Sequence, residues 1–496
     1  MIQRLICLCL CLLWLPSVDA VTEERWYSVR LDHQHIGYLL SSRQREGDRL
    51  TSRNELRIQF NRNGERLQVM SDETSIESSD GRPLAFSSQF ETSGIRSRVT
   101  GRVTHDGTIQ ADVEQAGQQQ KVSLPWPQNA LLAEGQRLHL QQFVQGQAGQ
   151  TDFLAFDPTS MRALRVRSQR VLDINQLFDS TTTDMLRRQP RLQQAWVAVQ
   201  QRLGRDGASV ETRMLLEHGS ADPLAMRVPA LGLQLDIIRC DRRCAMAEPE
   251  STDVLARATV ESPRALRADE RLRPLRYQIE LTGGNGKALG SLPGQHLSGD
   301  LDRPQLLIDL EGSPASPPTE RDLAATRWLQ SDDPKLSELA AAITRGQTRD
   351  RSRMLLLERR VRELIEVKSL RIGYASAREA LELGEGDCTE HAVLLAALAR
   401  AAGIPARVVT GLAYSTRFGE RKHVFVPHAW VIAWVDGRWH GYDAALPRFD
   451  AAHIGLAMGD GDPFDFYAGL DLLGRLQISE ISRPSRGQLK LARNAD

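Results

Sequence analysis

The sequence predicts an α+β protein in which a large, mainly antiparallel β region precedes a C-terminal domain of helices packed on an antiparallel sheet. Three observations lead to this fold class. Residues 26 to about 244 alternate polar and apolar side chains over short runs that turn residues separate. Helical periodicity begins only after a stretch rich in Pro and Ser at residues 313–319. A strongly apolar helical segment then starts near residue 388, and a strand-like segment follows at residues 427–435.

The composition is that of a folded protein with neutral net charge. The 496 residues are 41% hydrophobic and 25% charged, which leaves room for two or three packed cores and is atypical of disordered, collagen-like or polytopic membrane proteins. Lys plus Arg (63) equals Asp plus Glu (63). Because no positive excess would attract phosphates, we expect no nucleic-acid partner.

Residues 1–20 have the features of a secretory signal peptide. Arg4 precedes an apolar run from Leu5 to Leu15, and small residues lead to a cleavage site after Ala20. Eleven apolar residues are fewer than the roughly 20 that a membrane-spanning helix needs. We therefore expect an exported chain without a transmembrane anchor after cleavage.

Cleavage would leave three cysteines, namely Cys240, Cys244 and Cys388. Cys240 and Cys244 could close a short disulfide loop, and no further Cys or His cluster near them indicates zinc. This pairing would leave Cys388 as a single thiol in an oxidising compartment. Such a thiol is either buried and inert or reactive and used, and its neighbours decide between the two.

The β-rich region is expected to cover residues 21–312, in one or two subdomains. Turns such as Asp80-Gly81 and Asp106-Gly107 break it at hairpin spacing. A segment of helical character at about 181–203 interrupts it, and two more strands are expected at 275–283 and 305–312. No catalytic constellation occurs in this region, so we expect a structural or binding role. Residues 313–319 are the expected linker.

Two helices are expected at the start of the C-terminal domain, residues 320–496. Asp333-Pro334 supplies a cap and a first-turn proline for one of them. A second has apolar residues three and four positions apart, so that one face is buried. The apolar positions of the two helices are Leu336, Leu339 and Ile343, then Met354, Leu357, Val361 and Leu364.

The helix expected from residue 389 onward begins directly after Cys388. Its residues are apolar on nearly all sides, and Gly403 and Pro405 mark its end. At a helix N-terminus, unsatisfied backbone N–H groups and the positive end of the dipole favour thiolate over thiol. Cys388 is therefore placed as a nucleophile would be.

A base and an orienting acid are expected from a neighbouring β-hairpin. Asp436-Gly437 is a strong hairpin signal, and pairing of Val435 with Arg438 sets Trp430 opposite Asp443. His428 then shares a sheet face with Asp443 as its diagonal neighbour, at a separation that the two side chains can bridge. Nucleophile, base and orienting carboxylate follow the logic of a Cys-His-acid triad.

Three motifs occur in order, namely Gly-Asp-Cys (386–388), Gly-Ile-Pro-Ala-Arg (403–407) and His-Ala-Trp (428–430) with a hairpin leading to Asp443. Over residues 320–496 the chain resembles the transglutaminase-like core superfamily. The resemblance implies a papain-like fold, with Cys388 as nucleophile, His428 as base and later acid, and Asp443 as orienter. It also implies a bacterial exported protein, periplasmic or extracellular, that is a cysteine protease, amidase or transglutaminase-type acyl transferase acting on envelope proteins or peptides.

Other residues of this stretch have weaker claims. Tyr374 could donate to an oxyanion beside the N–H of Cys388, and His391 is expected to support or pack. His423 and His440 rank below His428 as the base. The tryptophans of the hairpin (430, 434 and 439) are expected in a core, and residues 459–462 form a turn rather than a calcium loop. No cofactor or metal is expected.

A different class of function remains open on the sequence alone. The triad could be vestigial, and the chain would then be a binding or assembly module of the cell envelope. Its β region would recognise a protein or glycan partner. Thiol reactivity separates the two hypotheses, because a vestigial site has no reason to keep an activated thiolate.

Overall fold

A computed structural model describes residues 21–495 except 63, 93–94, 116–117, 190–195, 206–207, 231–232, 254–257, 282–288, 290–291, 301–302, 312, 314–315, 370–373 and 463–475. The expected signal peptide at residues 1–20 lies outside the described residues. Among the helices that are described, none has the length and apolar character needed to cross a membrane.

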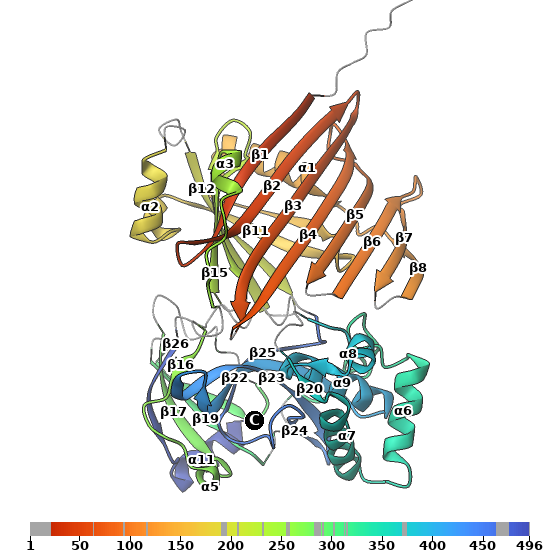
Figure 1. The fold of residues 1–496 in the computed structure, drawn as a ribbon, viewed down its shortest axis with the longest axis vertical. Helices are drawn as coiled ribbons and strands as arrows, with labels where there is room; N and C mark the ends of the chain where they lie inside the picture. Colours follow the sequence, from red (N-terminus) through yellow and green to blue (C-terminus); the bar gives the residue numbers. More distant parts are fainter. Residues whose placement is uncertain are drawn as a thin grey trace, which may run out of the picture.

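The N-terminal part is one curved, mainly antiparallel sheet that has 15 strands in the described residues, with β9 and β10 paired in parallel (Figure 1). Its spatial order is β8-β7-β6-β5-β4-β3-β2-β1-β15-β14-β13-β12-β11-β10-β9, so nearly every strand pairs with its neighbour in sequence. The strands are β1 Val21–Leu31, β2 Gln34–Glu46, β3 Arg49–Arg62, β4 Glu65–Ser78, β5 Pro83–Thr92, β6 Ile95–Val103, β7 Thr108–Gln115, β8 Gln118–Pro125, β9 Ala130–Leu131, β10 Gln150–Asp157, β11 Arg162–Val171, β12 Trp196–Arg205, β13 Ala208–Glu217, β14 Pro223–Ala230 and β15 Leu233–Cys240.

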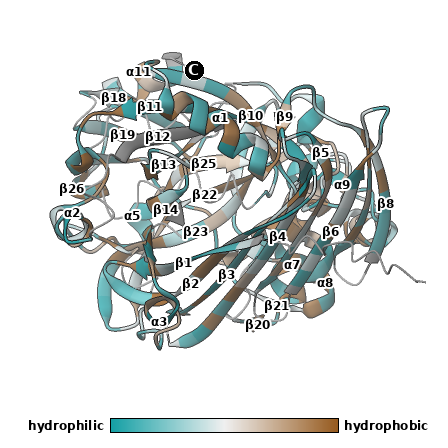
Figure 2. Ribbon diagram, turned by 90° about the horizontal axis from the view of Figure 1, so that it is seen from above, coloured by the Kyte–Doolittle hydropathy of each residue, from teal (hydrophilic) through white to brown (hydrophobic). Residues whose placement is uncertain are grey.

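Curvature brings distant strands of this sheet together. Phe86 of β5 packs on Phe156 of β10 with ring centroids 5.1 Å apart. Figure 2 shows hydrophobic and hydrophilic residues alternating along β2 and β3, as a sheet with one covered face requires. The expected hairpin turns at Asp80-Gly81 and Asp106-Gly107 are confirmed, since both glycines have the positive φ of tight turns.

Two segments of this region differ from the sequence prediction. Residues 133–145, expected as strand, form helix α1 (Ala133–Gln145), which buries Leu140, Phe143 and Val144 at helical spacing. The carboxylate of Glu77 caps α1 by accepting from the backbone N–H groups of Glu134 and Gly135. In the described residues of the expected helical segment 181–203, α2 (Ser180–Arg187) is helical and residues from 196 onward pair as β12 with β13. A short helix, α3 (Arg242–Ala245), follows β15.

The C-terminal part has helices packed on an antiparallel sheet, which confirms the predicted α+β class (Figure 1). The sheet order is β16-β23-β22-β25, with β24 paired to β23. Its strands are β16 Val260–Glu261, β22 Ala406–Phe418, β23 Arg421–Val435, β24 Arg438–Tyr442 and β25 His453–Gly459. The helices are α5 Ala268–Arg271, α6 Pro334–Thr344, α7 Asp350–Leu364, α8 Ala377–Leu383, α9 Cys388–Ala401 and α11 Arg486–Ala495.

A further sheet has the order β18-β19-β17-β26, with β17 Leu275–Leu281, β18 Gln295–Gly299, β19 Pro304–Ile308 and β26 Leu476–Ser482. The two strands expected around residues 275 and 305 are thus present. They lie with the C-terminal strands in Figure 1, and β16 pairs with β23. The strands β16 to β19 therefore pair with strands of the C-terminal part, whereas the expected boundary lay at 313–319.

The helices expected at the start of the C-terminal domain are confirmed. Asp333 caps α6 by accepting from the N–H groups of Lys335 and Leu336. Met354, Leu357 and Val361 of α7 are buried in the core that α9 shares with β22 and β23. This core fixes α9, and with it the position of Cys388.

Candidate active site

Cys388 is the first residue of α9 and is half-buried. Asp387 is the N-cap, and its Oδ1 accepts from the backbone N–H of Thr389 at 2.7 Å. In return, Oε2 of Glu390 accepts from the N–H of Asp387 at 2.9 Å. This reciprocal capping box starts the helix at the residue that the sequence predicted.

Glu390 holds the turn that precedes Cys388. Its Oε1 accepts from the N–H of Ala375 at 3.0 Å, and the side chain is fully buried. Burial, together with the negative charge of Asp387, raises the pKa of Glu390 to about 8. A Cβ at Gly386 would lie 2.5 Å from Cβ of Glu390, so glycine is required there for the turn to pack against this carboxyl group.

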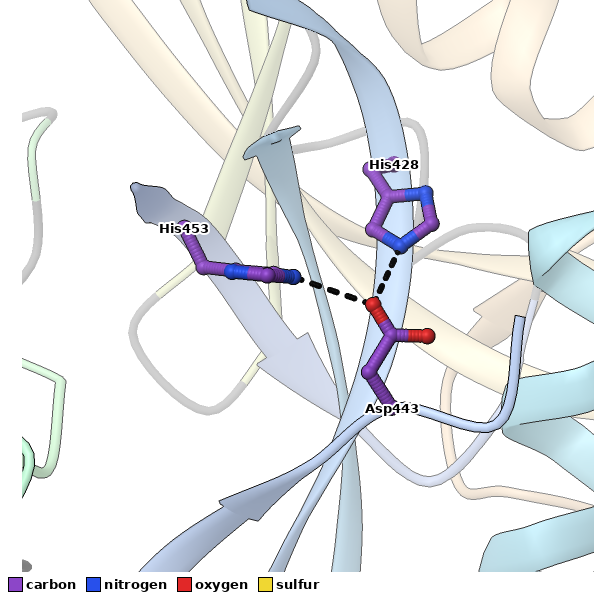
Figure 3. A group of neighbouring side chains, drawn as sticks. All are labelled: His428, Asp443 and His453. Atoms are coloured by element: carbon purple, nitrogen blue, oxygen red, sulfur yellow. Dashed lines mark hydrogen bonds and ion pairs between the residues drawn. The ribbon is translucent and has the colours of Figure 1, made fainter. Parts of the chain in front are cut away.

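The predicted hairpin register places His428 beside Asp443. Val435 pairs with Arg438 and Val431 with Tyr442 across the turn at Asp436-Gly437. Nε2 of His428 donates to Oδ2 of Asp443 at 2.7 Å (Figure 3). His428 is 6% exposed and Asp443 is fully buried, so solvent does not compete for this hydrogen bond.

Asp443 is held on both carboxylate oxygens. Oδ1 accepts from the N–H groups of Ala445 at 2.8 Å and Leu446 at 2.9 Å. Burial alone would raise the pKa of Asp443, but the charges and hydrogen bonds of His428 and His453 hold it far below its usual range. The group is therefore a carboxylate throughout the neutral range.

His453, the first residue of β25, is a member of this cluster that the sequence analysis missed. Its Nε2 donates to Oδ2 of Asp443 at 3.0 Å, and its Nδ1 lies 3.0 Å from the carbonyl oxygen of Asp450. Figure 3 shows both imidazoles directed at the same oxygen. Burial would lower the pKa of His453, but hydrogen bonds to Asp443 and Asp450 raise it to about 9. The only signal in the sequence was the spacing of Asp450 and His453.

The segment that leads into Cys388 is tied to the segment that follows Asp443. Lys368 of β20 (Val367–Lys368) pairs with Gly386 of β21 (Glu385–Gly386), two residues before Cys388. Nζ of Lys368 donates to the carbonyl of Ala445 at 2.8 Å. His391, in the first turn of α9, is within electrostatic reach of Asp443. The pairing of Lys368 with Gly386 and its bond to Ala445 tie the N-terminal end of α9 to the chain that follows Asp443.

The path of the chain agrees with this placement. α9 ends beside the start of β22, where Nε of Arg400 donates to the carbonyl of Ala406 at 3.0 Å. The helix spans roughly 20 Å at 1.5 Å per residue. The same length along β22 leads from Ala406 to the neighbourhood of Gly411, which pairs with His428.

The residues with weaker claims lie as follows. The hydroxyl of Tyr374 donates to the carbonyl of Gly461 at 2.7 Å, so an oxyanion role would require this bond to break. Nδ1 of His391 donates to the carbonyl of Asp387 at 2.6 Å. His423 bonds the hydroxyl of Tyr414 at 2.7 Å. His440 is half-buried in β24, and burial lowers its pKa. None of these histidines has a recorded bond to Asp443 among the described residues.

The tryptophans of the hairpin are core residues, as expected. Trp430 and Trp439 are buried with Val409 and Ile432, and Trp434 packs against them. Cys240 and Cys244 are thiols in this structure, and the pKa of Cys240 is raised by burial and by its contact with Cys244. Their disulfide therefore stays a prediction. Residues 459–462 include the end of β25, and Asp460 pairs with Arg400 at 2.8 Å.

His428, Asp443 and His453 also have the spacing of a metal site, with ligand atoms within 4.8 Å of one another. Both Nε2 atoms, however, donate to Oδ2 of Asp443 and so carry protons. A second such group, His33, Asp179 and Asp236, includes two exposed members, and Arg227 pairs with both of its carboxylates. We therefore describe both groups as hydrogen-bonded clusters.

Comparison with known proteins identifies the domain. Residues 337–444 match the family model of the transglutaminase-like superfamily, so the chain carries a transglutaminase-like domain in its C-terminal part. The match includes Cys388, His428 and Asp443, whereas His453 lies beyond it. A comparison with curated proteins finds no match.

Three solved structures are similar to parts of the chain. A candidate cysteine protease from Cytophaga hutchinsonii has 19% identity, with 43% of this chain and 83% of that chain covered and a TM-score of 0.28. The periplasmic domain of TgpA from Pseudomonas aeruginosa, bound to ethylmercury, has 15% identity, coverage of 57% and 89%, and a TM-score of 0.26. A β-barrel-like protein of unknown function, DUF1849, from Brucella abortus has 12% identity, coverage of 45% and 96%, and a TM-score of 0.31.

Proposed function

We propose that the chain is an exported cysteine-dependent amide hydrolase or acyl transferase that works through an acyl-enzyme on Cys388. The observation that carries the proposal is the buried 2.7 Å hydrogen bond between His428 and Asp443, beside the N-terminal end of the helix that begins at Cys388. Because Nε2 of His428 is engaged by Asp443, Nδ1 is the nitrogen that serves the thiol. Proteins or peptides of a bacterial cell envelope are the proposed substrates.

The acylation step follows from these positions. The thiolate of Cys388 attacks the amide carbonyl carbon, and the carbonyl electron pair moves to oxygen as a tetrahedral intermediate forms. The backbone N–H of Cys388, at the helix N-terminus, is the expected donor to that oxygen. The intermediate collapses, the C–N bond breaks, and the imidazolium of His428 gives its proton to the departing amine.

The second step decides the reaction class. Neutral His428 takes a proton from water or from an amine as that nucleophile attacks the thioester. Water yields a carboxylic acid, and an amine yields a new amide. In both cases the thiolate leaves and the imidazolium of His428 is restored, while Asp443 keeps the imidazole in one tautomer and orientation.

Alkylation of Cys388 tests the proposal without knowledge of the substrate. The rate of labelling by iodoacetamide is measured against pH in the wild type, in His428→Ala and in the matched control His423→Ala, and mass spectrometry locates the label. We expect Cys388 to react rapidly well below about pH 8.5, the pKa of an ordinary thiol. The reaction should slow in His428→Ala and stay unchanged in His423→Ala.

After reduction of any bond to Cys240, the exposed Cys244 serves as the internal reference in the same samples. If Cys388 has an ordinary thiol profile in the native protein, or reacts only after denaturation, the catalytic proposal is wrong. A binding or assembly role that depends on the β region would then replace it. In that case the next step would be pull-down experiments with the full chain, which contains the β region.

A further inference from the structure

Oδ2 of Asp443 accepts two imidazole N–H groups. His428 donates to it from β23 at 2.7 Å, and His453 donates to it from β25 at 3.0 Å (Figure 3). The proposed mechanism uses only the first of these bonds. All three side chains are buried, so the second bond persists without competition from solvent.

We propose that His453 is a positioning residue of the active site, which fixes Oδ2 of Asp443 opposite His428 and offsets the charge of Asp443 with its own. The inference rests on the proposed function of Cys388 and His428. It adds a residue that lies outside residues 337–444, the part of the chain that matches the superfamily model.

The contacts of His453 favour a doubly protonated ring. Nε2 faces the carboxylate of Asp443, while Nδ1 lies 3.0 Å from the carbonyl oxygen of Asp450, 3.3 Å from its Oδ1 and 3.3 Å from its backbone nitrogen. Nδ1 thus meets two acceptors, including the nearest of the three atoms, against one N–H donor, and a proton on Nδ1 satisfies both acceptors. The raised pKa of His453, about 9, agrees with this state.

Asp450 is itself fixed by a cation. Its Oδ2 accepts from Nη1 of Arg271 of α5 at 2.8 Å, and its Oδ1 accepts from the N–H of Ala452 at 2.9 Å. Charges therefore alternate from Asp443 through His453 and Asp450 to Arg271. This arrangement keeps the His453 imidazolium paired on both sides, which is what a buried charge requires.

The geometry fixes the Asp443 carboxylate completely. An ionised carboxylate offers about four acceptor positions. Four donors occupy them in this structure, namely the two imidazoles at Oδ2 and the N–H groups of Ala445 and Leu446 at Oδ1. Without His453, Oδ2 would keep one donor and could turn away from His428.

The charge of His453 acts on the proton affinity of the site. Its ring centroid lies 5.7 Å from that of His428, and Trp430 and Phe449 pack against it. The charged groups around it are Asp443 and Asp450, with Arg271 behind Asp450. His453 also lines a cavity to which Asp309, the residue after β19, contributes. The carboxylate of Asp309 is paired with Arg493. A cation at this distance lowers the pH at which the Cys388–His428 unit gives up each of its protons.

The test compares two variants in the full chain, with alkylation of Cys388 as the readout. His453→Gln keeps an N–H near the position of Nε2 but removes the charge. The asparagine side chain of His453→Asn is too short to reach Asp443, so this variant removes both the N–H donor and the charge. We expect the pH midpoints of Cys388 alkylation to move up by about one unit in both variants, because a nearby positive charge is lost.

The plateau rate of Cys388 alkylation at high pH separates the effect of Asp443 orientation from the effect of the His453 charge. We expect it to fall further in His453→Asn than in His453→Gln, because only glutamine still holds Oδ2 of Asp443. His440→Gln is the matched control, since His440 is half-buried in the same domain without a recorded bond to Asp443. Midpoints of both variants within 0.2 unit of the wild type would overturn the inference. A role confined to packing would change thermal stability without moving the midpoints.

Failure of the proposed function gives a different pattern. In that case the wild-type profile is that of an ordinary thiol and does not depend on His428. If neither His453 variant folds, histidine-selective ¹⁵N NMR of Cys388→Ala, in which no thiolate holds a second proton on His428, decides the question. We expect one of the 11 histidines to keep both ring protons at pH 8. If every histidine has lost a proton at that pH, the inference is wrong.

Discussion

The sheets of the N-terminal and C-terminal parts of the molecule are assembled in different ways. In β1–β15 almost every strand pairs with its neighbour in sequence, and among the described strands the β1–β15 pairing joins the two ends of the region. In the C-terminal part, β16 pairs with β23 and β17 pairs with β26, across roughly 160 and 200 residues of chain. The first region is therefore built mainly from local pairings, whereas the C-terminal part also needs strands that come from far apart in the sequence.

Two groups of charged side chains, one from each region, differ in burial. On β3 and β4, Arg53 pairs with Asp72 across neighbouring strands, and the arginine side chain is 51% exposed. In the active site, Asp443 joins His428 and His453 from two strands and is fully buried. Loss of an exposed partner leaves its mate in water, whereas loss of a buried partner leaves an uncompensated charge.

The largest expected effect follows the loss of the buried carboxylate. Asp443→Ala leaves the imidazolium of His453 without one of its two acceptors. We expect the free energy of unfolding to fall by about 3 to 5 kcal/mol, the usual cost of breaking a buried ion pair. Urea unfolding at pH 7 measures it. If the free energy of unfolding falls by less than about 1 kcal/mol, the buried cluster contributes no more to stability than an exposed ion pair does.

Raising the pH should weaken the C-terminal domain by a comparable amount. The folded pKa of His453, about 9, lies above the unfolded value of about 6.5. Its stabilising contribution is therefore complete below pH 6.5 and is lost as the pH rises through 9, a change of about 3 kcal/mol. We expect urea unfolding between pH 7 and 9 to show a steeper loss in the wild type than in His453→Gln.

Equal slopes in the two proteins would contradict the charged state of His453. Glu390 and Glu73, whose pKa values burial raises to about 8 and about 7, lose their contributions in the same direction. Their effects cancel in the difference between wild type and variant, because both proteins contain them.

A methyl group added to β22 tests the close approach of two strands. A Cβ at Gly411 would lie 2.0 Å from the carbonyl oxygen of Ile454 in β25. Gly411→Ala should therefore separate β22 from β25 and lower the free energy of unfolding by about 1 to 3 kcal/mol. Gly149→Ala, where the added Cβ meets nothing within 4 Å, is the control next to β10. Similar losses in both variants would contradict the steric explanation.

The smallest effect is expected on the N-terminal sheet. Asp152 pairs with Arg167 at 2.9 Å, but the side chains are 38% and 53% exposed. Asp152→Ala should change the free energy of unfolding by less than about 0.5 kcal/mol, because water screens this pair. A change above 1 kcal/mol would remove the contrast between the two regions.

Local signals predicted much of the site. The apolar run that begins directly after Cys388 located the N-terminal end of α9 there, and the structure adds the cap at Asp387. The turn at Asp436-Gly437 fixed the register of β23 and β24 and so brought His428 to Asp443. Both features depend on residues that are close in sequence, where turn and capping chemistry decide the structure.

Non-local pairing explains what was not predicted. His453 reaches Asp443 because β25 pairs with β22, in a register that shifts between Thr410 and Gly411. No local pattern in residues 451–455 predicts that β25 pairs with β22. The partnership of β17 with β26 is likewise invisible in either segment, so residues 260–308 were grouped with the strands before them.

Formation of the acyl-enzyme tests the central claim, that Cys388 and His428 act as nucleophile and base, most directly. The full chain is mixed with p-nitrophenyl acetate, the burst of p-nitrophenol is recorded, and mass spectrometry locates the acetyl group. The account predicts a burst of about one equivalent per chain, acetylation at Cys388 and slow release of acetate, with the burst abolished in Cys388→Ala and strongly slowed in His428→Ala. A wild type without acetyl-Cys388, or equal acetylation in His428→Ala, would contradict it.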